Sequence, residues 1–300
     1  MARIMHLRRP MTDHCPYALA ALFVSCTTIA QVPVPYDLER PMVVHKLPPE
    51  LVEVSALTDV DSVTVACLQD ELGKVYHVDL RTGQASLKTS FAESGDFEGL
   101  TRVGIDMLAL RSDGLIYRLR PVGDVLQMSD TFRLRVAHQN LEGLGYDDLA
   151  KRVLVSPKDL LKGGPEERDV RVLYAFDPDD PEHRVDEVLT ISLVRITHQA
   201  RAKGIAIPTR RTEKGREVSA FKLRYSSVAV HPFTGHYYLL SAVDRSLLIL
   251  DRTGGLIWLA WLNERILPKP EGITFLPGGD MLISNEGKGG QPDLLRFNGQ

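Results

Sequence analysis

The sequence has little cysteine, no excess of basic charge and no serine-hydrolase motif, and each of these absences argues against a class of protein. Three cysteines in 300 residues are too few for a disulfide framework, and no CxxC or Cys/His spacing points to zinc. The formal net charge of −3 leaves no basic surplus for binding nucleic acid. Because no GxSxG motif or Ser–His–Asp set is evident, we nominate no catalytic residue.

A long hydrophobic run is also missing, which limits how the N-terminus can be interpreted. Residues 17–24 are apolar but too few to span a bilayer as a helix. Because three arginines precede this run, residues 1–26 are interpreted as a signal segment. Residues 23–26 resemble a bacterial lipobox, in which Cys26 is lipidated. Ordinary export and a cytoplasmic chain are the alternatives. We expect export to the periplasmic side of the cell envelope, with residues 27–41 as a proline-containing tether.

A short phrase recurs along the rest of the chain. It consists of Ser or Glu, then a small residue, then an apolar residue that begins a strand. Successive copies are separated by 43, 44, 84 and 45 residues. Each copy is followed by short apolar strands with Gly, Asn, Asp and Pro turns between them. The five copies are Ser55-Ala56-Leu57, Glu98-Gly99-Leu100, Glu142-Gly143-Leu144, Ser226-Ser227-Val228 and Glu271-Gly272-Ile273.

Four strands in a period near 44 residues predict the blade of a β-propeller. We therefore expect residues 42–300 to form an all-β, five-bladed propeller. The last repeat lacks its fourth strand, and residues 42–47 have strand character, so they are expected to close the last blade. A loose N-terminal strand is the alternative. The interval of 84 residues is interpreted as an insertion with a basic segment at 195–217, and a degenerate sixth blade is the alternative.

The repeated phrases resemble those of the SdiA-regulated family of bacterial propellers, over residues 42–298. The resemblance implies a five-bladed propeller, distantly related to NHL-repeat propellers, with a bound calcium ion and no established biochemical activity. Ala56 and Ser227 depart from the pattern, because glycine is usual at both positions. The phrases that carry the resemblance are Phe97-Glu98-Gly99-Leu100, Leu141-Glu142-Gly143-Leu144, Ser226-Ser227-Val228-Ala229-Val230-His231-Pro232, Pro270-Glu271-Gly272-Ile273 and Ile283-Ser284-Asn285-Glu286-Gly287.

The first residue of each phrase is a candidate metal ligand. It opens the innermost strand of its blade, so the symmetry of a propeller places all five copies around the central channel. Carboxylates facing one narrow channel repel each other, and a divalent cation removes the conflict. Donors that are all oxygen, in a channel with room for water, favour Ca²⁺. The alternative is that these side chains only form hydrogen bonds. The candidate ligands are Glu98, Glu142, Glu271, Ser55 and Ser226, with Glu286 from a neighbouring loop.

These features predict a calcium-binding propeller of the cell envelope that binds a small ligand or an envelope protein at its loop face. We expect a monomer that does not bind nucleic acid and that touches the membrane only through a lipid on Cys26. The alternative is a calcium-dependent hydrolase of lactonase or phosphoesterase type, in which the metal polarises a carbonyl or phosphoryl oxygen. That alternative rests on analogy between propellers, which host many functions, so a binding role is preferred.

Overall fold

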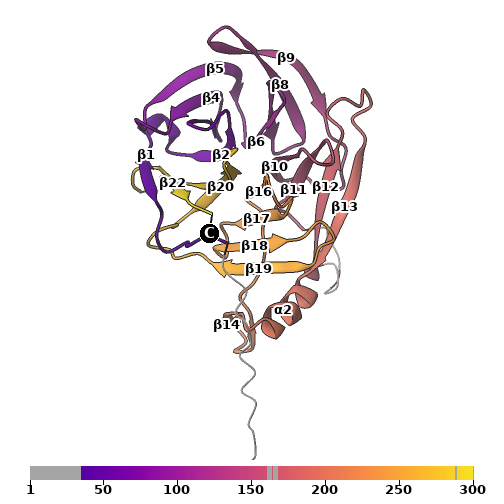
Figure 1. Ribbon diagram of the computed structural model, residues 1–300. Coiled ribbons are helices and arrows are strands. Elements are labelled where there is room, and N and C mark those ends of the chain that lie inside the picture. The colour runs from indigo at the N-terminus through magenta and orange to yellow at the C-terminus, as the bar shows by residue number, and fades with distance from the viewer. Residues whose placement is uncertain (1–34, 161–163, 165–167, 288, 300) are drawn as a thin grey trace, which may run out of the picture. The chain divides into compact units, whose positions relative to one another are not determined.

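Five four-stranded antiparallel sheets are present in the computed structural model, one for each predicted blade (Figure 1). The structure describes residues 35–160, 164, 168–287 and 289–299. The described residues all belong to one unit, Pro33–Gln300, and the predicted signal segment with Cys26 lies outside them. The prediction of a five-bladed propeller is therefore confirmed.

The first three blades follow one another along the chain, each running from the central channel outward. Blade 1 consists of β2 (Val54–Asp59), β3 (Thr64–Gln69), β4 (Leu72–Asp79) and β5 (Ala85–Ser94). Blade 2 consists of β6 (Phe97–Val103), β7 (Asp106–Arg111), β8 (Leu115–Val122) and β9 (Val125–Arg133). Blade 3 consists of β10 (Leu141–Asp147), β11 (Arg152–Pro157), β12 (Val170–Phe176) and β13 (Val185–Ser192).

The last blade combines three strands from the C-terminal part of the chain with one strand that precedes blade 1. Blade 4 consists of β16 (Ser227–Val230), β17 (Tyr237–Ser241), β18 (Ser246–Leu250) and β19 (Leu256–Trp261). Blade 5 consists of β20 (Pro270–Phe275), β21 (Met281–Asn285), β22 (Asp293–Phe297) and β1 (Val43–Lys46), and a short 3₁₀ helix, η1 (Pro49–Leu51), leads on to blade 1. Because β1 pairs antiparallel with β22, with Val43 opposite Arg296, the predicted closure by residues 42–47 is confirmed.

The hydrophobic core is divided among the five spaces between neighbouring blades. The second strand of each blade is covered on both faces, so its sequence is a continuous apolar run; β17, for example, is buried along its whole length. The innermost strands touch in the order β2, β6, β10, β16, β20 and back to β2. Gly99 permits this approach, since a Cβ atom there would lie 2.8 Å from the Cβ of Leu144.

The long interval between the third and fourth copies of the phrase contains an insertion, as predicted, and no sixth blade forms among the described residues. It comprises helix α2 (Leu193–Ala202) and a hairpin of β14 (Thr209–Arg211) and β15 (Glu217–Ser219). This helix was not predicted from the sequence. Leu193, Ile196 and Ala200 form its buried face against blades 3 and 4, at helical spacing. No helix in the described part of the chain is long and apolar enough to cross a membrane.

The described end of the predicted tether packs against the propeller. The Tyr36 side chain is 2% exposed, and its hydroxyl donates a hydrogen bond to the Gly279 carbonyl oxygen at 2.5 Å. The Tyr36 ring contacts the rings of His231, Tyr238 and Phe275, with centroid separations of 6.1–6.4 Å. Tyr36 therefore holds the segment that precedes β1 against blades 4 and 5.

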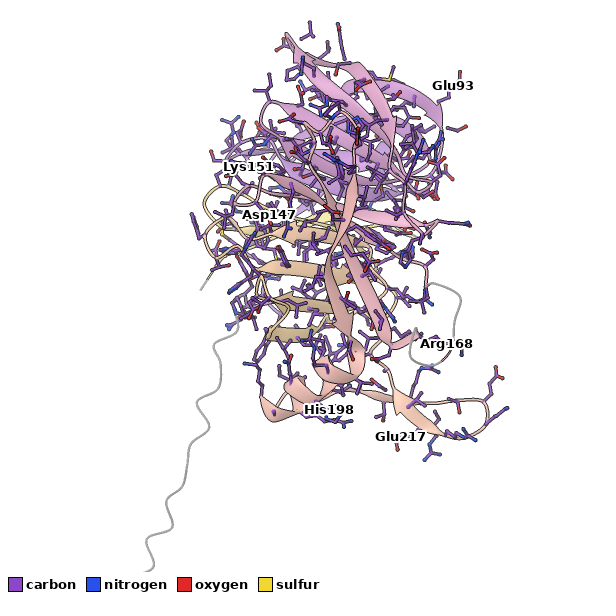
Figure 2. The ribbon with its side chains drawn as sticks, turned by 90° about the vertical axis from the view of Figure 1, so that its right-hand side faces the viewer. Glu93, Asp147, Lys151, Arg168, His198 and Glu217 are labelled. Carbon is purple, nitrogen blue, oxygen red and sulfur yellow. The ribbon has the colours of Figure 1, made fainter. Side chains whose placement is uncertain are left out.

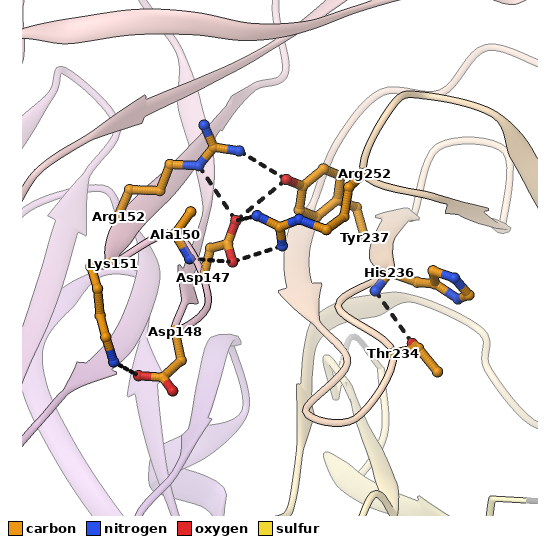
Figure 3. Close-up of polar contacts among 9 residues, drawn as sticks. All are labelled: Asp147, Asp148, Ala150, Lys151, Arg152, Thr234, His236, Tyr237 and Arg252. Atoms are coloured by element: carbon orange, nitrogen blue, oxygen red, sulfur yellow. Dashed lines mark hydrogen bonds and ion pairs between the residues drawn. The ribbon is translucent and has the colours of Figure 1, made fainter.

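A buried carboxylate joins blades 3 and 4 (Figure 3). Asp147, at the end of β10, is fully buried. Its two carboxylate oxygens accept hydrogen bonds from the Nη1 and Nη2 atoms of Arg252, both at 2.9 Å, in a bidentate pair. The Arg152 Nε atom lies 3.4 Å from the same carboxylate, and Arg152 Nη2 donates to the Tyr237 hydroxyl at 2.9 Å. The network ties two blades together through one acidic side chain.

Candidate metal site and axial cavity

Five of the six predicted site residues form a central ring, which we define as Ser55, Glu98, Glu142, Ser226 and Glu271. In four of the blades the ring residue is the extra residue of a β-bulge. The strand register shifts between Phe97 and Gly99, and it shifts at the matching point in β2, β10 and β20. A bulge leaves one residue unpaired and redirects its side chain. The repeated phrase therefore encodes a repeated backbone feature that presents one polar side chain at the channel.

The three carboxylates of the central ring lie close enough to repel each other, and two of them are buried. Glu142 is 1% exposed and Glu271 is 9% exposed. Burial, followed by the charges of Glu142 and Asp96, raises the pKa of Glu98 from its ordinary 4.5 to about 9. Burial also raises the pKa of Glu142 to about 7, although Lys158 acts in the opposite direction. Without a bound cation, Glu98 therefore keeps its proton at neutral pH, because ionising all three carboxylates would place more negative charge here than the nearby lysines neutralise.

Two lysines partly compensate this charge. The Lys158 Nζ atom lies 3.0 Å from both carboxylate oxygens of Glu142. Lys269 Nζ lies 3.2 Å from Glu271 Oε1 and also pairs with Glu286, whose side chain is 10% exposed. Glu98 is different, because its carboxylate forms no hydrogen bond or ion pair within the described part of the chain. Glu98 is thus the ring glutamate whose charge would be least compensated by the described lysines.

The two serines of the central ring also connect neighbouring blades. The Ser55 hydroxyl donates a hydrogen bond to the Phe97 carbonyl oxygen at 2.7 Å, and the Ser226 hydroxyl donates to the Pro270 carbonyl oxygen at 3.1 Å. Each acceptor immediately precedes a ring glutamate in the next blade. A donating hydroxyl keeps its lone pairs, so the serine oxygens can still face a cation while holding the two blades together.

Two charged residues that the repeated phrase does not include, Asp96 and Lys269, share this end of the channel. Asp96 and Lys269 stand two positions before Glu98 and Glu271, and each accepts a backbone hydrogen bond from the loop after the second strand of its blade. Asp70 occupies such a loop; burial and then Glu53 raise its pKa to about 6, and its Oδ1 atom is buried without a partner in the described chain. Extending the repeat alignment two residues upstream would have revealed Asp96 and Lys269.

The residues present fit a hard divalent cation in chemical type. This end of the channel has six carboxylates, from Asp70, Asp96, Glu98, Glu142, Glu271 and Glu286, against the ammonium groups of Lys158 and Lys269. Calcium prefers carboxylate, hydroxyl and water oxygens in a flexible arrangement. Across the described residues, no group of three or more His, Cys, Asp or Glu side chains is already arranged around one point as metal ligands. Calcium would therefore have to draw the carboxylates together and compete with Lys158.

An apolar layer separates the central ring from the opposite end of the channel. It is formed by the residue two positions after each ring residue, and each of its members is 3% exposed or less. Beyond this layer lies an axial cavity of about 400 Å³, lined by all five blades. Its rim carries Arg102, which forms an ion pair with Asp59, together with Tyr146, Asp148 and His231. The apolar layer consists of Leu57, Leu100, Leu144, Val228 and Ile273.

Comparisons with known proteins support the fold and leave the activity open. No family model matches the chain, and no curated protein matches it. Among solved structures, glutaminyl cyclase from Myxococcus xanthus is similar with a TM-score of 0.55 and 14% identity, covering 87% of this chain and 96% of that one. The PQQ-bound aldose sugar dehydrogenase from Streptomyces coelicolor has a TM-score of 0.53 and 13% identity, covering 87% and 98%. At these identities the likeness concerns the propeller fold alone.

Proposed function

We propose that this protein is a calcium-binding β-propeller of the SdiA-regulated family that acts as a binding protein in the cell envelope. In this proposal calcium occupies the central ring and a small ligand or partner occupies the axial cavity. The proposal rests on the partly buried Glu98 carboxyl group, which lies beside Glu142 and Glu271 and has no ion-pair partner in the described chain. A bound divalent ion would supply the missing positive charge.

The arrangement along the channel favours binding over catalysis. In a calcium-dependent hydrolase, the metal contacts the substrate oxygen that it polarises. Here the 400 Å³ axial cavity lies beyond the apolar layer, so an ion in the central ring would not face a ligand in that cavity. Glutaminyl cyclase and aldose sugar dehydrogenase are enzymes, but their likeness to this chain is one of fold. Calcium in the ring would instead stabilise the blades that shape the cavity.

A calcium titration by calorimetry tests the proposal. The purified protein should bind one Ca²⁺ with an affinity in the micromolar to millimolar range. Glu98→Gln should weaken calcium binding at least about tenfold. The substitution puts a neutral amide in place of the one ring glutamate that has no lysine partner in the described chain. Lys158→Met should strengthen binding, since it removes the ammonium group that competes for Glu142 at 3.0 Å.

The matched control is Glu93→Gln. Glu93 is an exposed carboxylate on β5, the outermost strand of blade 1, and is not a ring residue (Figure 2), so its replacement should leave calcium affinity unchanged. The proposal fails if no heat of binding is detected, or if Glu93→Gln weakens binding as much as Glu98→Gln does.

A further inference from the structure

The insertion and blade 3 enclose a second cavity, of about 1070 Å³, which we call the basic groove. Figure 2 shows helix α2 and the hairpin at the same edge of the propeller, with Arg168 nearby. Five cationic side chains line the groove, and Lys158 reaches it from the central ring. Such a density of positive charge is notable in a chain whose formal net charge is −3. The five cations of the groove are Arg168, Arg171, Arg210, Lys222 and Arg224.

The carboxylates that line the groove are already engaged. Asp169 accepts hydrogen bonds from the Ser192 hydroxyl at 2.6 Å and from the Val194 N–H at 2.9 Å. Asp159 accepts from two backbone N–H groups at 3.4 Å. Within the described chain, none of the five groove cations forms an ion pair with a carboxylate. The positive charges of Arg210, Lys222 and Arg224 therefore remain available to an anion.

The backbone that carries these cations is held firmly in place. Arg171 is 5% exposed and donates hydrogen bonds to the carbonyl oxygens of Leu223 at 2.7 Å and Arg168 at 2.8 Å. The Asp244 carboxylate accepts from the N–H groups of Lys222 and Leu223. Because these bonds fix the chain on both sides of Lys222, its ammonium group and the Arg224 guanidinium are presented from a preorganised segment.

The groove also has apolar walls, which narrows the class of ligand. Phe221 and Leu193 are buried beneath it, while Val194 and Val243 are 56% and 48% exposed at its edge. A uniformly polar polyanion would leave this apolar surface uncovered. The α2 N-terminus is not the source of the attraction, because Asp169 and Ser192 already accept hydrogen bonds from its first N–H groups.

We propose that the basic groove binds an anionic amphiphile, meaning a free molecule with a phosphate or carboxylate head and an apolar chain. The head would pair with Arg210, Lys222 and Arg224, and the chain would cover Val194 and Val243. Charge complementarity and apolar burial would act together in such a complex. This site does not use Glu98 and does not depend on calcium in the central ring.

Dodecyl phosphate is the probe, used below its critical micelle concentration, in EDTA, with the full chain. Trp261 provides a fluorescence signal, because its ring packs edge-on against Phe221 at a centroid separation of 5.7 Å. The double variant Arg210→Gln, Lys222→Gln should weaken binding at least tenfold. Arg211→Gln is the matched control, since Arg211 follows Arg210 in β14 but does not line the groove, and it should change affinity less than twofold.

Three results would overturn the proposal. The first is that neutral dodecyl maltoside binds as tightly as dodecyl phosphate. The second is that the double variant binds as tightly as the unmodified protein. The third is binding to phosphatidylglycerol vesicles without binding to monomeric dodecyl phosphate, which would make the basic groove a membrane-surface contact. Binding to both the monomer and the vesicles, lost in the double variant, supports the proposal.

Discussion

Replacing Asp147 by asparagine should lower the free energy of unfolding by about 3 kcal/mol, because removing one partner from a buried charge network leaves the others uncompensated. Asp147 is fully buried, while the side chains of Arg152 and Arg252 are 28% and 33% exposed. Burial alone would raise the pKa of Asp147, but hydrogen bonds from Arg252 outweigh that effect and hold it below its ordinary value. The carboxylate is thus ionised at neutral pH, and urea denaturation followed by circular dichroism measures the loss.

The neighbouring residue Asp148 provides the control. Asp148 and Lys151 form an ion pair 2.7 Å long, but their side chains are 76% and 70% exposed (Figure 3). Solvent screens such a pair, so Asp148→Asn should leave the urea midpoint almost unchanged. Equal destabilisation by the two substitutions would show that the buried network does not hold blades 3 and 4 together.

Without divalent cations, the protein should become less stable as the pH rises from about 4.5 to 9. The folded-state pKa values of Glu98 and Glu142, about 9 and about 7, exceed their ordinary value of 4.5. Over this interval the unfolded chain releases protons that the folded protein retains, so each increase in pH favours unfolding. Glu98→Gln should flatten the decline, whereas Glu93→Gln should preserve it. Thermal unfolding in EDTA across this pH range measures the effect.

Calcium should reverse this loss of stability at high pH, because it replaces the protons as the source of positive charge. Its stabilising effect should be larger at pH 8 than at pH 5, and it should reach about 2.7 kcal/mol when calcium is present at 100 times its dissociation constant. The central ring does not act as the calcium site if calcium raises the melting temperature equally at both pH values, or if Glu98→Gln responds to calcium as the unmodified protein does.

The repeat pattern was sufficient to predict the propeller because its signal is local and is present five times. Each ring residue precedes a small residue and an inward apolar residue, and the bulge at Glu98 recurs at Ser55, Glu142 and Glu271. The closing strand could be predicted because the last repeat ends one strand short. Helix α2 was missed because its buried residues Leu193, Ile196 and Ala200 lie among polar neighbours in a segment outside the repeat.

The composition of the central ring could be predicted, but its electrostatics could not. Propeller symmetry places Glu98, Glu142 and Glu271 at one level of the channel. The pairing of Lys158 with Glu142 depends on side-chain conformations in a loop after β11. The pairing of Lys269 with Glu286 joins the residue before β20 to the residue after β21. Three further features combine residues that are far apart in the sequence: the axial cavity, the Asp147 network and the basic groove. A local sequence pattern therefore cannot predict them.

A crystal structure determined with calcium tests the central proposal most directly. Anomalous difference density should appear in the central ring, with carboxylate oxygens of Glu98, Glu142 and Glu271 at about 2.3–2.6 Å from the ion. Lys158 should move away from Glu142 to admit it. If the ring instead contains no density at saturating calcium and Lys158 Nζ remains 3.0 Å from Glu142, the central ring is held together by hydrogen bonds and lysines alone, and the calcium proposal is wrong.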